Sequence, residues 1–127
     1  MIVTCDNGIA ATEAIAYAKS LGIIVVVTDH HEVPFKEEMG IRSYILPNAD
    51  AIVNPKQKDC NYPFKGLCGA GVAYKLVQVL YENAKLPLEE LYRFLEYAAI
   101  ATVADVMDLV GENRIIVNRI AGNYGSE

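Results

Sequence analysis

The residues best suited to chemistry are consecutive: Asp29, His30 and His31, which include the only two histidines of the chain. They come directly after Ile23–Thr28, a run of Ile and Val that ends in Thr. Such a run is typical of a strand buried on both faces of a parallel sheet. Because open α/β sheets hold their ligands at the carboxyl ends of the strands, we expect a carboxylate and two imidazoles at the mouth of a binding crevice.

Two further carboxylates fall at the ends of predicted elements. Asp6 follows the apolar stretch Met1–Cys5, and a helix beginning near Thr12 would connect that strand to the next one. This β-α-β unit puts Asp6 and Asp29 at the same edge of the sheet, within about 10 Å of each other if the strands are neighbours. Asp105 ends a later predicted helix, where the helix dipole disfavours a carboxylate unless a cation is bound.

This set of residues favours a divalent metal over a covalent nucleophile. Carboxylate and imidazole ligands suit Mn²⁺, Mg²⁺ or Zn²⁺, and no serine stands beside a histidine. Metal-activated water is then the natural hydrolytic route, and two metal ions would clamp the attacking and leaving oxygens of a phosphodiester. We therefore take Asp6, His30 and Asp105 as candidate ligands. The alternatives are a turn acid with two exposed histidines, and a solvated acid at a helix end.

A second group of residues is suited to contact with a nucleotide strand. Lysines alternate with aromatic residues in and around the irregular segment Asn54–Gly66, namely at Lys56, Lys58, Tyr62, Phe64 and Lys65. This mixture could stack on bases and neutralise phosphates, although a solvated loop with two anchoring aromatics would have the same composition. Gly69 and Gly71 permit close packing or the approach of a phosphate, but without a preceding strand they form no nucleotide-binding fingerprint. We take Lys65, Gly69 and Gly71 as candidate substrate-binding residues.

The hydrophobic pattern predicts an α/β fold, with a Rossmann-like parallel sheet and flanking helices, followed by a mainly helical C-terminal part. Residues 32–50 are predicted to be loop-like, with a short strand at 43–46, and a brief strand follows at 51–53. Three helices are then expected, at 67–85, from 87 or 88 to about 107, and at 113–123.

The composition is that of one domain, or most of one, with 127 residues of which 53% are hydrophobic. The apolar runs are too short to cross a bilayer, no signal peptide is evident, and the three cysteines fit no zinc spacing. We therefore predict a cytoplasmic protein that contacts no membrane. The net charge of −5 argues against nucleic-acid binding by bulk electrostatics alone, but it is compatible with clustered acids that bind cations.

These motifs resemble the DHH phosphoesterases. The residues at 29–31 match the motif that names this family, and segments 3–9 and 102–106 resemble its preceding and later aspartate motifs. Segments 52–56, 62–65, 67–73 and 109–114 resemble the RecJ branch, whose members are single-stranded-DNA-specific exonucleases acting from the 5′ end. The resemblance extends from Val3 to about Arg119.

The resemblance implies a role for each residue of the site. Asp6 would be a metal ligand shared between two ions, His30 would be a further ligand, and Asp105 would complete the site. His31 would meet the scissile phosphate, and Asp29 would orient the histidine pair, as outer carboxylates usually do. The ions would be Mn²⁺ or Mg²⁺.

The resemblance also implies that residues 1–127 are a partial DHH domain. The first motif of the family, an Asp-x-Asp pair after an earlier strand, and its C-terminal substrate-binding domain have no counterpart in this sequence. The two-metal site would lack two carboxylates, so we expect weak or no nuclease activity from this chain alone. The alternatives are another DHH phosphodiesterase, acting on oligoribonucleotides or cyclic dinucleotides, and a non-catalytic DHH-fold scaffold in a replication complex.

Single-stranded DNA is the partner that the resemblance implies, in DNA repair and recombination. A single-strand-binding protein and a helicase are further candidate partners, between which the sequence does not choose. The presence of Asp6, His30 and Asp105 argues against the scaffold alternative. A parallel sheet whose first strand lacks a neighbour would expose an unpaired edge, so we also expect a tendency of this chain to self-associate.

Overall fold

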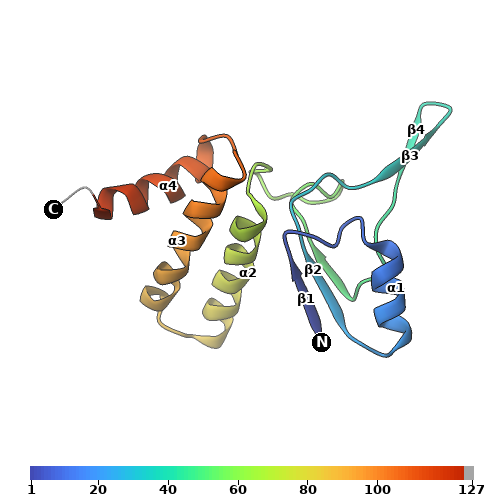
Figure 1. Cartoon of the computed structure of the whole chain (residues 1–127), viewed down its shortest axis with the longest axis horizontal. Coiled ribbons are helices and arrows are strands. Elements are labelled where there is room, and N and C mark those ends of the chain that lie inside the picture. Colours follow the sequence, from blue (N-terminus) through green and yellow to red (C-terminus); the bar gives the residue numbers. More distant parts are fainter. Residues whose placement is uncertain (125–127) are drawn as a thin grey trace. The chain divides into compact units, whose positions relative to one another are not determined.

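The chain folds into two compact units. The computed structural model describes residues 1–124, and its contacts divide it into Met1–Asn61 and a second unit that begins at Tyr62. The first unit contains the strands and one helix, and the second contains three helices (Figure 1). This arrangement confirms the predicted α/β class with a mainly helical C-terminal part. Among the described residues, no helix combines the length and the apolar character needed to span a membrane.

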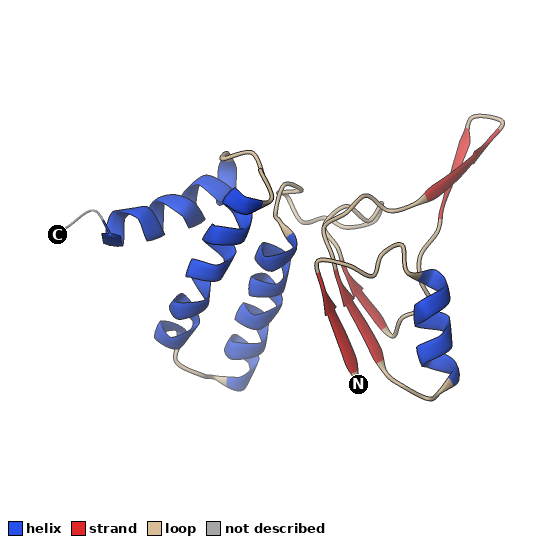
Figure 2. Ribbon diagram, in the orientation of Figure 1, coloured by secondary structure: helices blue, strands red, loops and turns tan. Residues whose placement is uncertain are grey.

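A parallel three-stranded sheet forms the centre of the first unit (Figure 2). Its strands, in spatial order, are β1 (Ile2–Cys5), β2 (Val25–Thr28) and β5 (Ala51–Val53). The register pairs Cys5 with Thr28 and Thr28 with Val53, so the three strands end at one level. The prediction that β2 begins at residue 23 was wrong, because Ile24 is 53% exposed and the strand begins only at Val25.

One helix, α1 (Thr12–Ser20), supplies the core of the first unit. Its side chains Ile15 and Ala18 pack with Val25 and Val27 of β2 in one buried cluster. Asp50, just before β5, fixes the start of β2, because its Oδ2 accepts a hydrogen bond from the Val25 N–H at 2.7 Å. The β-α-β unit predicted from the sequence is therefore present, with α1 covering one face of the sheet.

The segment at residues 32–50, predicted to be loop-like with one short strand at 43–46, contains a β-hairpin, which corrects the loop prediction and moves the predicted strand two residues earlier. Its strands are β3 (Phe35–Glu38) and β4 (Ile41–Tyr44), and they extend away from the sheet as a two-stranded arm (Figure 1). Met39 and Gly40 both have positive φ angles, which suits the tight turn of a hairpin. All eight strand residues are exposed, so neither strand alternates between buried and exposed positions.

The second unit is a bundle of three helices, which are α2 (Gly69–Ala84), α3 (Leu88–Ala104) and α4 (Gly111–Tyr124). Its buried apolar side chains include Leu67, Val72, Leu91, Leu95, Ala98 and Ile116. All three helices were predicted, but α3 ends about three residues before the expected position. Asp105 caps its C-terminus, and Val106 takes a left-handed φ of 54° that ends the helix.

Gly8, in the connection between β1 and α1, provides a test of this packing. Its φ is +112°, and an added Cβ would lie 2.8 Å from Thr4 Oγ1 and 3.0 Å from Cγ1 of the fully buried Val27. Gly8→Ala should therefore lower the free energy of unfolding by about 2–4 kcal/mol. Gly22→Ala is the matched control: its φ is +74° with nothing within 4 Å, so it should cost only about 1 kcal/mol. Equal losses in chemical denaturation would contradict this account.

Candidate metal centre

Asp29 is the buried carboxylate around which the candidate site is built, with 1% of its surface exposed. Its Oδ2 accepts a hydrogen bond from the backbone N–H of Ile9 at 2.9 Å. Its Oδ1 accepts the backbone N–H groups of His30 at 2.8 Å and His31 at 3.2 Å, and lies 2.7 Å from His31 Nδ1. This one side chain therefore joins the β1–α1 connection to the turn that follows β2.

The same hydrogen bonds decide the charge of Asp29. Burial by itself raises the pKa of this carboxyl group. Hydrogen bonds outweigh this effect, and they come from the Ile9 backbone, the His31 side chain and the backbones of His31 and His30. The pKa of Asp29 is therefore lowered, and the group is ionised at neutral pH. Because an ionised Oδ1 can only accept a hydrogen bond, this contact holds a proton on His31 Nδ1 and leaves Nε2 as the ring nitrogen that faces away from Asp29.

Asp6 and His30 face each other at the ends of β1 and β2. Asp6 Oδ1 lies 3.0 Å from His30 Nε2, with the Asp6 side chain 53% exposed and that of His30 8% exposed. The Asp6 N–H donates to the carbonyl of Thr28 at 3.1 Å, which continues the pairing of the strands by one residue. Asp6 has a left-handed φ of 62°, a conformation that Asp tolerates better than most residues.

Asp6, His30 and His31 come together as a potential ligand group. One ligand atom from each lies within 4.8 Å of the others. Two ligand atoms that bind one cation at about 2.0–2.2 Å lie at most about 4.4 Å apart, so a small movement of the side chains would bring this group around an ion. A carboxylate with imidazoles also suits the divalent ions Mn²⁺ and Zn²⁺. The sequence analysis grouped Asp6 with His30, and the structure adds His31 to the same cluster.

Asn54 supports this site from the third strand, a role that the sequence analysis did not give it. It follows β5 and is 2% exposed. Its Nδ2 donates to the carbonyl of His31 at 3.0 Å, and its Oδ1 accepts the N–H of Lys56 at 2.8 Å. A signal was available, since Asn54 follows its strand as Asp6 and Asp29 follow theirs.

The second unit carries the other predicted site residues, which are Asp105, Lys65, Gly69 and Gly71. Asp105 is exposed at the end of α3, and Lys65 is exposed in the segment before α2. Gly69 and Gly71 are buried in the first turn of α2, where an added Cβ on Gly71 would lie 3.3 Å from Leu67 Cδ2. Close packing therefore accounts for one of these glycines, and the functional roles of all four residues stay predictions.

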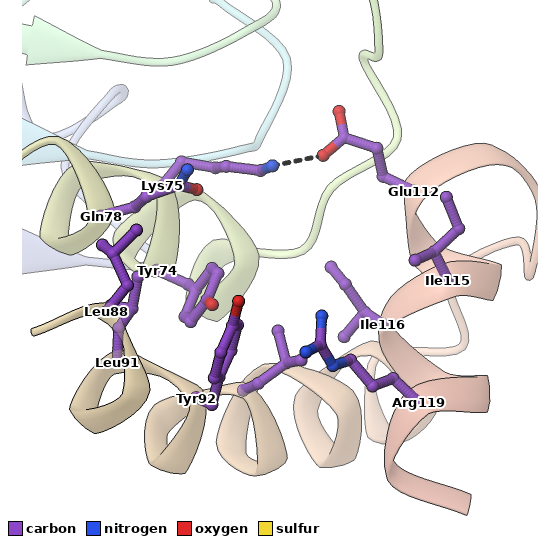
Figure 3. Close-up of a pocket in the computed structure, with 11 residues that line it drawn as sticks. Tyr74, Lys75, Gln78, Leu88, Leu91, Tyr92, Glu112, Ile115, Ile116 and Arg119 are labelled. Atoms are coloured by element: carbon purple, nitrogen blue, oxygen red, sulfur yellow. Dashed lines mark ion pairs between the residues drawn. The ribbon is translucent and has the colours of Figure 1, made fainter. Parts of the chain in front are cut away.

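A cavity of about 360 Å³ lies among α2, α3 and α4 in the second unit (Figure 3). Aliphatic and aromatic side chains such as Leu91, Tyr92 and Ile116 line it, together with the ion pair of Lys75 and Glu112. None of the predicted site residues is part of this lining. The cavity and the Asp6–His30–His31 cluster are therefore separate features.

The chain is similar to known proteins in both sequence and structure. Residues 1–102 match the family described as "DHH family, N-terminal domain". The chain is similar to the single-stranded-DNA-specific exonuclease RecJ of Bacillus subtilis (strain 168), with 47% identity over 116 residues. It is also similar to the protein of the same name from Escherichia coli (strain K12), with 39% identity over 125 residues. Each match covers 91% of this chain, but only 13% and 20% of the respective relative.

Solved structures share the fold of this chain. A crystal structure of exonuclease RecJ bound to manganese matches with a TM-score of 0.70 and 31% identity, over 91% of this chain and 26% of that one. A crystal structure of RecJ from Thermus thermophilus in complex with Mn²⁺ matches with a TM-score of 0.69 and 32% identity, over 91% and 16%. The chain thus spans between 13% and 26% of the length of these proteins.

The role of Asp29 can be tested through stability. Asp29→Ala should lower the free energy of unfolding by about 3–5 kcal/mol, because several buried N–H donors lose their acceptor. Asp29→Asn keeps one carbonyl oxygen and should cost less, about 1–3 kcal/mol. The exposed Asp59→Asn is the control and should change little. Denaturant titration that finds Asp29→Ala as stable as Asp59→Asn would refute the central position of this carboxylate.

Proposed function

Because this chain belongs to the DHH family, we propose that it is part of a metal-dependent, single-stranded-DNA-specific exonuclease. The convergence of Asp6, His30 and His31 within 4.8 Å is the observation that carries this proposal. It supports a catalytic role over that of a scaffold, since a scaffold has no need of clustered ligands. The names of the similar proteins support single-stranded DNA as the substrate.

We propose Asp6, His30 and Asp105 as ligands of Mn²⁺ or Mg²⁺, in a two-metal site to which residues 1–127 contribute one part of a larger DHH domain. The Asp6 carboxylate suits both ions, and the similar RecJ structures are bound to manganese, which supports this choice. Bound divalent cations would polarise the scissile phosphate and increase the acidity of the attacking water. Asp105 is included on the strength of its sequence motif alone.

His31 acts, in this proposal, on the scissile phosphate. Asp29 holds a proton on His31 Nδ1, at 2.7 Å from its Oδ1, and so fixes the orientation of the ring. When Nε2 also carries a proton, it can donate a hydrogen bond to a phosphate oxygen, and the buried charge of Asp29 stabilises the imidazolium. Asn54 holds the backbone of His31 in place through its carbonyl.

We propose that Lys65 contacts the DNA backbone and that the buried Gly69 and Gly71 let the DNA come close to the start of α2. The exposed Lys65 would neutralise a phosphate, and the glycines in the first turn of α2 would let a phosphate approach the positive end of the helix. We further propose that the enzyme works in DNA repair and recombination in the cytoplasm. A single-strand-binding protein or a helicase is a fitting partner there, because either one handles the same single strand.

The metal site predicts a specific pattern of activity in the full-length protein. Degradation of a labelled single-stranded oligonucleotide should require Mn²⁺ or Mg²⁺ and stop when a chelator is added. Asp6→Asn should reduce the rate by about 100-fold or more, because a metal ligand loses its charge. Asp59→Asn removes the same charge from an exposed position and should retain activity. Unchanged degradation by Asp6→Asn, or cleavage restricted to short oligoribonucleotides or cyclic dinucleotides, would contradict the proposal.

Asp105 and the isolated chain provide a second test. Asp105→Asn in the full-length protein should lose activity to a similar extent as Asp6→Asn, since both are proposed as ligands. Residues 1–127 alone should show weak or no nuclease activity with Mn²⁺, because the proposed site is incomplete in them. Full activity of Asp105→Asn would remove this residue from the ligand set, and robust cleavage by residues 1–127 would show that the set is already complete.

A further inference from the structure

The segment from Tyr62 to Gly66 has no helix or strand, yet its residues alternate in burial. Tyr62, Phe64 and Gly66 are partly buried, while Pro63 and Lys65 are exposed. An alternation with a period of two places successive side chains on opposite sides of an extended chain. One side of this segment is therefore held by contacts within the second unit, and the other side carries Lys65.

Two of the contacts on the held side come from the first residues of α4. Glu112 Oε1 accepts a hydrogen bond from the Tyr62 hydroxyl at 2.6 Å, while Glu112 Oε2 pairs with Lys75 of α2 at 2.5 Å (Figure 3). Burial alone raises the pKa of Glu112, but the hydrogen bonds from Lys75 and Tyr62 outweigh it and lower the pKa. Gly111 lies against the Phe64 ring, where an added Cβ would be 2.9 Å from Cε2.

The third contact comes from Asn113, which is fully buried. Its Nδ2 donates to the carbonyl of Gly66 at 2.8 Å and to the carbonyl of Asp108 at 3.0 Å. Its Oδ1 is buried and accepts no hydrogen bond from the described residues, which costs stability. The Asn113 amide therefore acts through the two hydrogen bonds that it donates, which join the Tyr62–Gly66 segment to the turn between α3 and α4.

We propose that Glu112 and Asn113 are positioning residues for substrate binding. They hold the Tyr62–Gly66 segment so that Lys65 is presented to a phosphate of single-stranded DNA, and neither of them needs to touch the DNA. This inference rests on the proposed function. A lysine on a segment that is ordered before the DNA arrives loses less conformational freedom on binding, and without this order its contact with the phosphate is too weak to form.

The salt dependence of binding separates positioning from a merely structural role. Each phosphate of a single strand that a cation neutralises contributes about 0.7 to the slope of log Kd against log salt concentration. Tyr62 and Asn113 are uncharged, so removing their contacts changes no charge on the protein. A substitution at either residue can lower this slope only if it disturbs a charged contact elsewhere, and the proposal identifies that contact as the one made by Lys65.

The experiment measures binding of a fluorescent oligothymidylate to the full-length protein, without Mn²⁺ or Mg²⁺, over a series of KCl concentrations. Lys65→Ala should reduce the slope by about 0.7. Asn113→Ala and Tyr62→Phe should reduce it by a similar amount and weaken binding. The double variant Lys65→Ala/Asn113→Ala should show no reduction beyond that of Lys65→Ala, because both changes remove the same contact.

Tyr74→Phe is the matched control, because it also removes one tyrosine hydroxyl, but from a buried residue of α2 outside the Tyr62–Gly66 segment. It should keep the full slope. Wild-type slopes in both Asn113→Ala and Tyr62→Phe, or an additive reduction in the double variant, would overturn the proposal. Tyr62→Phe, which removes a single oxygen, remains decisive if Asn113→Ala does not fold. Failure of the wild-type protein to bind the strand would instead refute the proposed function, and this inference with it.

Discussion

The candidate site depends on one buried carboxylate that is shared by several donors. Asp29 accepts hydrogen bonds from Ile9 in the β1–α1 connection and from both residues that follow it. An ionised group with 1% exposure is tolerated only when such bonds replace its hydration. The same hydrogen bonds fix the backbone of the donor residues, so the turns after β1 and β2 take one conformation.

The register of the sheet explains why the turns after β1 and β2 lie next to each other. All three strands are parallel and end at one level, so Asp6, Asp29 and Asn54 each leave the sheet at the same edge. The Thr28 hydroxyl donates to the carbonyl of Thr4 at 2.6 Å, a side-chain bond that ties the last residues of β1 and β2 together. A short sheet with a fixed register can therefore hold the candidate metal ligands together within a unit of about sixty residues.

Much of the first unit could be predicted from the sequence. The Ile and Val run and the spacing to Asp6 were enough to predict parallel strands with both acids at one edge, because strand direction fixes where strand ends lie. The number of donors to Asp29 could not be predicted, since the N–H of Ile9 comes from a residue 20 positions away. The β3–β4 hairpin gave only a partial signal: the strand predicted at 43–46 overlaps β4, but β3 was not predicted, because neither face of the hairpin is buried.

In the second unit, the helices followed from apolar spacing, whereas the contacts that organise the Tyr62–Gly66 segment did not. Tyr62 meets Glu112 across 50 positions and Gly66 meets Asn113 across 47, and no periodicity links residues at such separations. The predicted helix start at residue 113 also missed Gly111 and Glu112, which belong to the first turn of α4. Contacts between residues far apart in the chain are thus the feature that the sequence reveals least.

The central claim is that the turn organised by Asp29 forms a metal centre with Asp6 and His30. The most direct measurement is a crystal structure of the full-length protein grown with Mn²⁺, with anomalous diffraction recorded at the manganese edge. The account predicts an anomalous peak about 2.0–2.3 Å from a carboxylate oxygen of Asp6 and from Nε2 of His30. Manganese peaks only at other positions, with Asp6 and His30 still facing each other and no ion between them, would contradict it.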